Sequence, residues 1–154
     1  MEASVHRIEV RYTRDPRLKT RTDRIRSLGF LIDELHLIDV FTIATVARDF
    51  THDELVQVAS QLTNPVVQEC SVDEPTRASF DYAIEVGFLP GVTDNIGTTA
   101  RQTIEDFLSR KFSEGEAVYS SQLFLICGNL QKDRIRKLAA ALANPLVNRV
   151  HIKT

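Results

Sequence analysis

The sequence has little of what marks several classes of protein. Its 154 residues include only two cysteines, too few for a disulfide framework, and we expect no secretory leader before the first strand. Its apolar runs are far too short to cross a bilayer, since a spanning helix needs about 20 predominantly apolar residues. The formal net charge of -2 is not the footprint of a nucleic-acid binder. We therefore expect a cytoplasmic protein that binds neither nucleic acid nor membrane.

Two segments of nearly the same pattern stand out in what is present. They are Leu-Thr-Asn-Pro-Val-Val at 62–67 and Leu-Ala-Asn-Pro-Leu-Val at 142–147. Each should end a helix and begin a strand, because the residue before a proline is pushed out of the α region and the residues after it favour extension. Each copy also opens with Ile-Glu-Val, at Ile8 and at Ile84. The chain is therefore predicted to be a repeat of two domain-like units, a pseudo-dimer rather than a solenoid.

Each copy is predicted to contain strands and helices in the order β-α-β-β-α-β. In the first copy we expect a strand at 5–12, a helix at 18–28, two strands within 35–46 that break near Asp39, a helix from the capping box at Thr51 to Leu62, and a strand at 66–72. The second copy should follow with a strand at 82–88, a helix ending near 108, a strand region at 119–127, a helix at 132–143 and a strand at 146–152.

The predicted fold class is α+β, with two ferredoxin-like β-α-β-β-α-β lobes. The lobes are residues 1–74 and 79–154, and the polar segment 75–78 links them. Each lobe would leave one sheet face uncovered. We therefore expect faces or edges to join, so that the two lobes pack as an intrachain pseudo-dimer.

Residues that usually carry catalysis or metal binding are sparse. No stretch reads G-x-x-x-x-G-K-S/T, the loop that cradles nucleotide phosphates. Cys70 and Cys127 align in the repeat with small apolar residues of the other copy, so we predict that both thiols pack in the core. The four histidines show no helical or short-loop spacing with a carboxylate as third ligand. We therefore predict no catalytic residue, no metal and no cofactor in this chain.

Three segments match the motifs of one known family. They are Phe88-Leu89-Pro90-Gly91-Val92-Thr93-Asp94-Asn95-Ile96-Gly97, similar to Leu-Lys-Pro-Gly-Val-x-Asp-x-x-Gly; Ser27-Leu28-Gly29-Phe30, similar to Leu-Gly-Phe/Tyr; and Leu62-Thr63-Asn64-Pro65-Val66-Val67-Gln68-Glu69, similar to Leu-x-Asn-Pro-Val-Ile-Glu. The chain resembles the PurS family, the small subunit of phosphoribosylformylglycinamidine synthase. It looks even more like the doubled PurS-like region at the N-terminus of long, single-chain PurL enzymes.

Each copy departs from the family pattern where the other is faithful. The first copy has Arg-Asp-Pro-Arg at 14–17 in place of the Pro-Gly-Val loop. The second copy carries Phe-Leu-Ser-Arg-Lys-Phe at 107–112 in place of the Leu-Gly-Phe helix end. This complementary loss is typical of a fused pseudo-dimer whose halves have diverged.

The resemblance implies a role in de novo purine biosynthesis for a chain that is not catalytic on its own. In that family the small subunit helps hold a PurL-type synthetase and a PurQ-type glutaminase together. The complete enzyme uses ATP, Mg and glutamine to convert the formylglycinamide ribonucleotide to the amidine, and partner domains would use these cofactors. The implied partners are the synthetase and glutaminase domains or subunits, and a second copy of the chain is a further candidate.

Two loops, each between a first strand and a first helix, are the candidate partner interface. The first loop and its helix carry a basic run that could meet an acidic partner surface or remain a solvated face. The second loop could cradle an anion at a helix N-terminus, or only turn the chain and cap the helix. The candidate interface residues are Arg14, Arg17, Arg21, Pro90, Gly91 and Asp94.

A second class of function fits the same predicted fold. Tandem ferredoxin-like lobes also form small-molecule sensor or regulatory domains, and fold alone does not separate the two functions. Such sensors usually bind an effector at a lobe interface through a glycine-containing loop after the first strand. Gly91 lies in such a loop.

Overall fold

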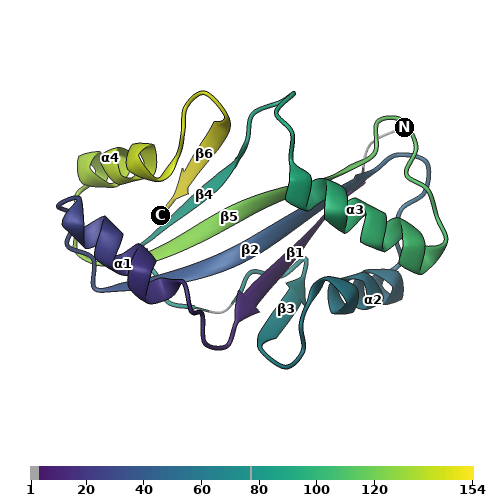
Figure 1. Cartoon of the computed structure of the whole chain (residues 1–154), viewed down its shortest axis with the longest axis horizontal. Coiled ribbons are helices and arrows are strands. Elements are labelled where there is room, and N and C mark those ends of the chain that lie inside the picture. Colours follow the sequence, from purple (N-terminus) through teal and green to yellow (C-terminus); the bar gives the residue numbers. More distant parts are fainter. Residues whose placement is uncertain (1–3, 77) are drawn as a thin grey trace. The chain divides into compact units, whose positions relative to one another are not determined.

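A computed structural model describes residues 4–76 and 78–154 of the chain. Within them, the order β-α-β-α-β occurs twice along the sequence (Figure 1). The first set is β1 (Ser4–Tyr12), α1 (Leu18–Ser27), β2 (Glu34–Thr45), α2 (His52–Leu62) and β3 (Gln68–Val72). The second set is β4 (Tyr82–Phe88), α3 (Asn95–Leu108), β5 (Ala117–Cys127), α4 (Lys132–Leu142) and β6 (Asn148–Lys153).

The fold class is α+β, as predicted. The strands form a six-stranded antiparallel sheet in the order β3-β1-β2-β5-β4-β6. In register, Ile8 of β1 lies opposite Phe41 and Val72, and Ile84 of β4 lies opposite Phe124 and Ile152. Among the described helices, none is both long enough and apolar enough to cross a membrane.

The predicted strand break near Asp39 is wrong. β2 runs without interruption from Glu34 to Thr45, and Asp39 itself pairs with Val10 of β1. The apolar and β-branched residues on both sides of Asp39 keep the chain extended, and a single polar residue does not end a strand with such neighbours. Each half of the sequence is therefore β-α-β-α-β with one long central strand, and not β-α-β-β-α-β.

The chain divides into two compact units that differ from the predicted lobes 1–74 and 79–154. Unit 1 consists of Met1–Thr13, Asp39–Thr76 and Thr93–Ser120. Unit 2 consists of Arg14–Ile38, Arg77–Val92 and Ser121–Thr154. Each unit thus takes one helix from each half of the sequence, α2 and α3 in unit 1 and α1 and α4 in unit 2. The predicted linker 75–78 is described except at residue 77, which lies outside the described residues.

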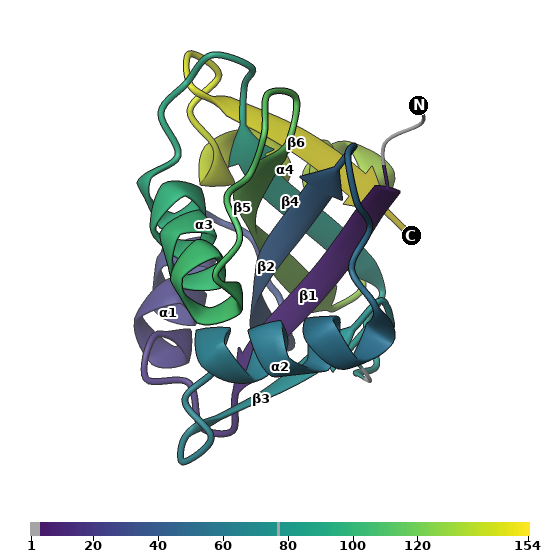
Figure 2. The same cartoon turned by 90° about the vertical axis from the view of Figure 1, so that its right-hand side faces the viewer.

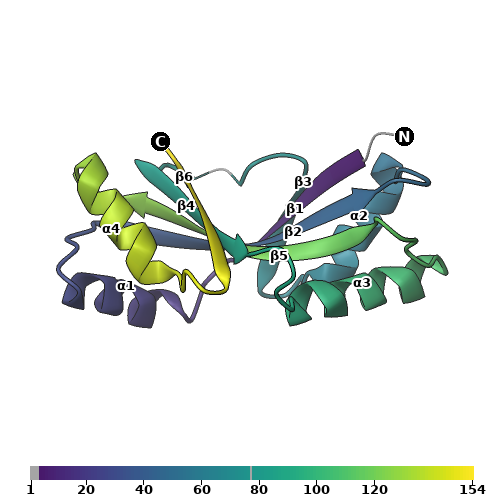
Figure 3. The same cartoon turned by 90° about the horizontal axis from the view of Figure 1, so that it is seen from above.

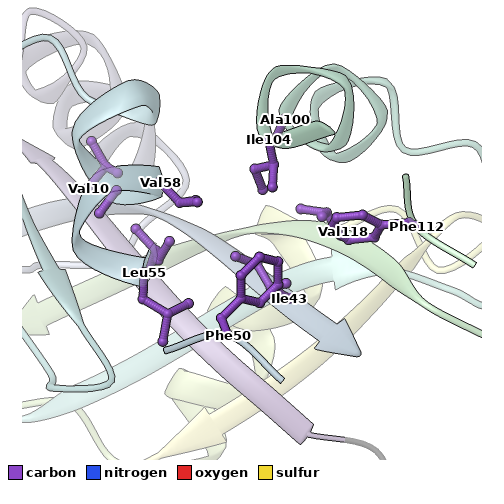
Figure 4. Packing of buried hydrophobic residues seen from close by; sticks show 11 residues of the cluster. Val10, Ile43, Phe50, Leu55, Val58, Ala100, Ile104, Phe112 and Val118 are labelled. Atoms are coloured by element: carbon purple, nitrogen blue, oxygen red, sulfur yellow. The ribbon is translucent and has the colours of Figure 1, made fainter. Parts of the chain in front are cut away.

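Unit 1 has its own core, in which α2 and α3 pack against the same strands. Figure 2 shows α2 and α3 beside each other, and the two helices are in contact. α2 starts at the predicted capping box, where the Thr51 hydroxyl accepts from the Glu54 amide and the Glu54 carboxylate accepts from the Thr51 amide. The cluster in Figure 4 comprises Ile8, Val10, Ile43, Phe50, Leu55, Val58, Ala59, Ala100, Ile104, Phe112 and Val118.

Unit 2 has a separate core that joins α1 and α4 to β4 and β5. Figure 3 shows α4 close to β4 and β6, which it contacts. The cluster comprises Ile25, Phe30, Ile32, Leu35, Leu37, Ile84, Phe124, Ile126, Ile135, Leu138 and Ala139. Because residues of α1 and α4 pack on the same strand residues, the two helices cover one face of these strands.

The first helix of each half ends in a comparable way despite the different sequences. After α1, Gly29 has a positive φ of 94° and is followed by Phe30, which is 5% exposed. After α3, Ser109 has a positive φ of 49°, and Phe112, 7% exposed, enters the core three residues later. The glycine adopts this conformation without the steric cost that the serine carries. The segment 107–112 therefore replaces the Leu-Gly-Phe motif while still delivering a phenylalanine to the core.

The two Asn-Pro segments form matching turns, which confirms the predicted helix ends. The Asn64 carbonyl oxygen accepts from the Gln68 amide at 2.7 Å, and the Asn144 carbonyl oxygen accepts from the Asn148 amide at 2.7 Å. Each asparagine side-chain oxygen also accepts from the amide two residues later, at 3.1 Å in the first turn and 3.0 Å in the second. These turns delay the following strands, so β3 and β6 begin two residues later than predicted.

Candidate functional site

The first loop of the candidate interface contains one exposed arginine, Arg14, and one that is hydrogen-bonded to a neighbouring aspartate, Arg17. Arg14 is exposed. Arg17 donates from Nε to Oδ1 of Asp15 at 2.9 Å and from a terminal nitrogen to Oδ2 at 2.7 Å. Burial raises the pKa of the Asp15 carboxyl, but the hydrogen bonds from Arg17 outweigh this and the pKa is lowered. Arg17 therefore compensates a carboxylate that is only 3% exposed.

Arg21 is also engaged within its own unit. Its guanidinium donates to the side-chain oxygen of Gln122 on β5 at 3.1 Å, and the residue is only partly exposed. Replacing Arg17 or Arg21 would thus disturb α1 as well as remove charge. Of the three predicted arginines, Arg14 is the one whose exposed side chain best suits contact with a partner.

The second loop separates into an exposed tip and a structural cap. Pro90 and Gly91 are exposed, and Gly91 has a positive φ of 84° with nothing within 4 Å of the position of an added Cβ. Asp94 is the N-cap of α3, where its Oδ1 accepts from the Gly97 amide at 2.8 Å and from the Ser120 hydroxyl at 2.6 Å. Its other oxygen accepts from the Ser120 amide. The loop therefore caps a helix at Asp94, and the carboxylate there opposes binding of an anion.

The matching Asn-Pro turns expose apolar side chains that sequence reasoning did not single out. Val66 is 85% exposed and Leu146 is 82% exposed, more than any other large apolar side chain among the described residues. The two residues hold the same place in their turns, directly after the proline. The signal was present in the sequence as an apolar residue after Asn-Pro in both copies. The exposure of these residues became evident only from the structure, in which they belong to the turn and not to a half-buried strand.

The prediction that both thiols pack in the core is wrong. Cys70 is exposed and Cys127 is partly exposed. Cys70 lies on β3, which is at one end of the strand order, opposite Val10 of β1. An edge position explains the exposure, because only one neighbouring strand covers it.

Cys127 has a distinctive environment at the end of β5. Its Sγ donates to the Ser79 carbonyl oxygen at 3.1 Å. Burial raises the pKa of the Cys127 thiol, and the carboxylates of Glu34, Asp81 and Asp33 raise this pKa further. An unassisted thiol with a raised pKa is mostly protonated near neutral pH and is a weak nucleophile.

Three residues with metal-binding side chains meet here, although their spacing in the sequence did not predict it. Glu34, His36 and Cys127 each place one potential ligand atom within 4.8 Å of the other two. Glu34 and His36 are two residues apart on β2, and Cys127 lies on β5. Helical and short-loop spacings do not reveal such a group, because two of its members share a strand face and the third comes from a distant segment.

A further charged cluster joins three segments of unit 1. His6 of β1 has Nε2 at 2.6 Å from Asp49 Oδ1 and Nδ1 at 2.7 Å from Asp73 Oδ2. A carboxylate against each ring nitrogen favours the imidazolium form, in which both nitrogens donate. Burial lowers the pKa of His6, but the hydrogen bonds to Asp73 and Asp49 outweigh it and the pKa is raised. The hydrogen bond from His6 is the main reason that the pKa of Asp49 is lowered.

We expect the His6 cluster to make folding stability depend on pH. Because the pKa of His6 rises on folding, its contribution is complete below the unfolded value of 6.5 and is lost as pH rises through the folded pKa. Because the pKa of Asp49 falls on folding, its contribution is present above the unfolded value of 3.8 and is lost on acidification. The Asp49 and Asp73 side chains are 51% and 44% exposed, so the total should stay within about 1 kcal/mol.

The measurement is urea unfolding from pH 5 to 9. The difference in unfolding free energy between the wild type and His6→Gln should be largest below pH 6.5 and shrink at higher pH. His52→Gln, at an exposed position on α2, is the matched control and should leave the profile unchanged. A constant difference between the wild type and His6→Gln across this range would rule out the charged cluster.

No family model matches the chain, and no curated protein matches it.

Proposed function

We propose that the chain is a non-catalytic assembly component of phosphoribosylformylglycinamidine synthase in de novo purine biosynthesis. It would bridge or support the PurL-type synthetase and the PurQ-type glutaminase, as the motif resemblance implies. The observation that carries the proposal is the pair of matching Asn-Pro turns, each of which exposes an apolar residue, Val66 or Leu146. Apolar side chains held in solvent by ordered turns, at the same place in both copies, are well suited to bury against a partner.

We also propose that the two halves are fused PurS-like copies, an intrachain pseudo-dimer that has exchanged helices. The support is that each compact unit takes one helix from either half, α1 with α4 and α2 with α3. Exchange of identical elements between copies is a common route to a dimer. If two such copies were fused into one chain, the exchanged arrangement would be preserved. In this arrangement the chain as a whole keeps at least one faithful copy of every motif without needing two equal sites.

Substitution of Val66 and Leu146, the exposed apolar residues of the Asn-Pro turns, gives the direct test of the assembly role. In the double variant Val66→Ser and Leu146→Ser, affinity for the purified synthetase and glutaminase should fall about 10- to 100-fold for each of the two side chains that a partner buries. This follows because full burial of one such side chain stabilises by about 1.5–3 kcal/mol and 1.4 kcal/mol is tenfold in affinity. The unfolding free energy should change by less than about 0.5 kcal/mol per site, because both side chains are exposed.

Leu31→Ser is the matched control, since Leu31 is also apolar and 77% exposed but lies outside the Asn-Pro turns. It should bind the partners as the wild type does. Wild-type affinity in the double variant would contradict a role for Val66 and Leu146 in partner binding. If an amino acid or nucleotide raised the melting temperature and neither partner bound, the sensor function would replace the assembly function.

A further inference from the structure

The group formed by Glu34, His36 and Cys127 has the geometry of a metal site, and all three residues belong to unit 2. His36 Nε2 lies 3.3 Å from Glu34 Oε1. Two ligands at about 2.0 Å from a tetrahedral zinc ion are about 3.3 Å apart, so this pair needs almost no adjustment. The Cys127 sulfur, within 4.8 Å of both, could close on the same ion by a small side-chain rotation.

The backbone around the three residues is held in place on both strands. The amide of Asp33 donates to the Cys127 carbonyl oxygen at 2.8 Å, next to Glu34. The amide of Gly128 donates to the Asp81 carboxylate at 2.8 Å. An added Cβ on Gly128 would lie 3.3 Å from the Ile32 Cα, so the two segments approach closely there. Ligands carried by strands with such support are positioned more exactly than ligands on loops.

The charges around the group favour a cation. A thiolate and a Glu34 carboxylate would balance a divalent ion, with the imidazole of His36 neutral. Asp33 and Asp81 add two carboxylates close enough to act electrostatically on Cys127. A mixed set of sulfur, nitrogen and oxygen donors suits zinc and is a poor match for magnesium or calcium, which take oxygen ligands.

We propose that Glu34, His36 and Cys127 bind one zinc ion, with the fourth position filled by water. The ion would fasten the start of β2 to the end of β5. The site is independent of the assembly role, since none of its residues belongs to the Asn-Pro turns or to the predicted partner loops.

Calorimetric titration of the untagged, chelator-treated chain with zinc chloride tests the site. One ion should bind per chain, and Cys127→Ser or His36→Gln should each weaken binding at least about tenfold. Cobalt should give a thiolate-to-cobalt charge-transfer band in the wild type that is lost in Cys127→Ser. Cys70→Ser and His52→Gln are matched controls, since they remove the other thiol and an exposed histidine. They should bind zinc as the wild type does.

A second measurement uses only the wild-type chain and so does not depend on the variants folding. Zinc should slow maleimide alkylation of Cys127 at least about tenfold, because a metal-bound thiolate is a poorer nucleophile, and should leave the rate at Cys70 unchanged. It should also raise the melting temperature. Equal effects of zinc on both thiols, binding other than one ion per chain, or undiminished binding by Cys127→Ser would overturn the proposal.

Discussion

Neither half of the chain should fold on its own when the chain is divided between residues 76 and 77. The unit 1 core draws Ile104, Phe112 and Val118 from the second half, and the unit 2 core draws Ile25 and Phe30 from the first. Losing three large buried side chains removes about 5–9 kcal/mol of the stabilisation that apolar burial provides. Small domains have only about 5–15 kcal/mol of stability in total, so the loss is comparable to the whole.

The measurement is circular dichroism and urea unfolding of fragments 1–76 and 77–154, alone and mixed. Each fragment alone, at low concentration, should lack a cooperative transition, and an equimolar mixture should recover one. Recovery in the mixture is the control that both fragments are intact. Cooperative unfolding of either fragment as a monomer would instead support the lobes 1–74 and 79–154 that the sequence alone predicted.

Gly97→Ala should destabilise the chain by about 2–4 kcal/mol, although alanine is the better helix former. A Cβ on Gly97 would lie 2.5 Å from the Val118 carbonyl oxygen and 2.7 Å from Asp94 Oδ2. The backbone oxygen cannot rotate away, so α3 must move off β5. The shift would strain the packing by about 1–3 kcal/mol and weaken the Asp94 cap by about 0.5–2 kcal/mol.

Gly91→Ala in the same loop is the matched control for this prediction. Nothing lies within 4 Å of its Cβ position, so only the positive φ of 84° opposes alanine there. The expected cost is about 1–2 kcal/mol, below that of Gly97→Ala. Urea unfolding of the two variants at the same pH compares them directly. A Gly97→Ala variant as stable as the wild type would mean that α3 does not press against β5 as closely as described.

The contacts around Gly97 also give a physical reason for the glycine at this position of the motif. It lies three residues after Asp94, where the cap needs the Gly97 amide and the strand leaves no room for a side chain. The Pro-Gly-Val-x-Asp-x-x-Gly pattern thus describes a helix start pressed against a strand. Of the three residues predicted in this loop as candidates for partner contact, Asp94 is explained by the cap, and Pro90 and Gly91 remain.

The sequence by itself determined those features that depend on local interactions. The helix ends before Asn64 and Asn144 follow from steric exclusion by the next proline, and the start of α2 follows from the Thr51 capping box. These signals act over a few residues, so they do not depend on what packs against the helix. The buried face of α2, with Leu55, Val58 and Ala59, likewise follows from the helical spacing of these apolar residues.

Only the tertiary structure decided which segments come together. α1 and α3 have apolar faces of the same kind, so periodicity could not say which strands each helix covers, and the structure placed each in a unit with the other half's second helix. The same limit applies to Cys127, whose neighbours Glu34 and His36 are distant in sequence. Non-local packing chooses among partners that local patterns leave equivalent, because burial depends on apolar area and shape and not on position along the chain.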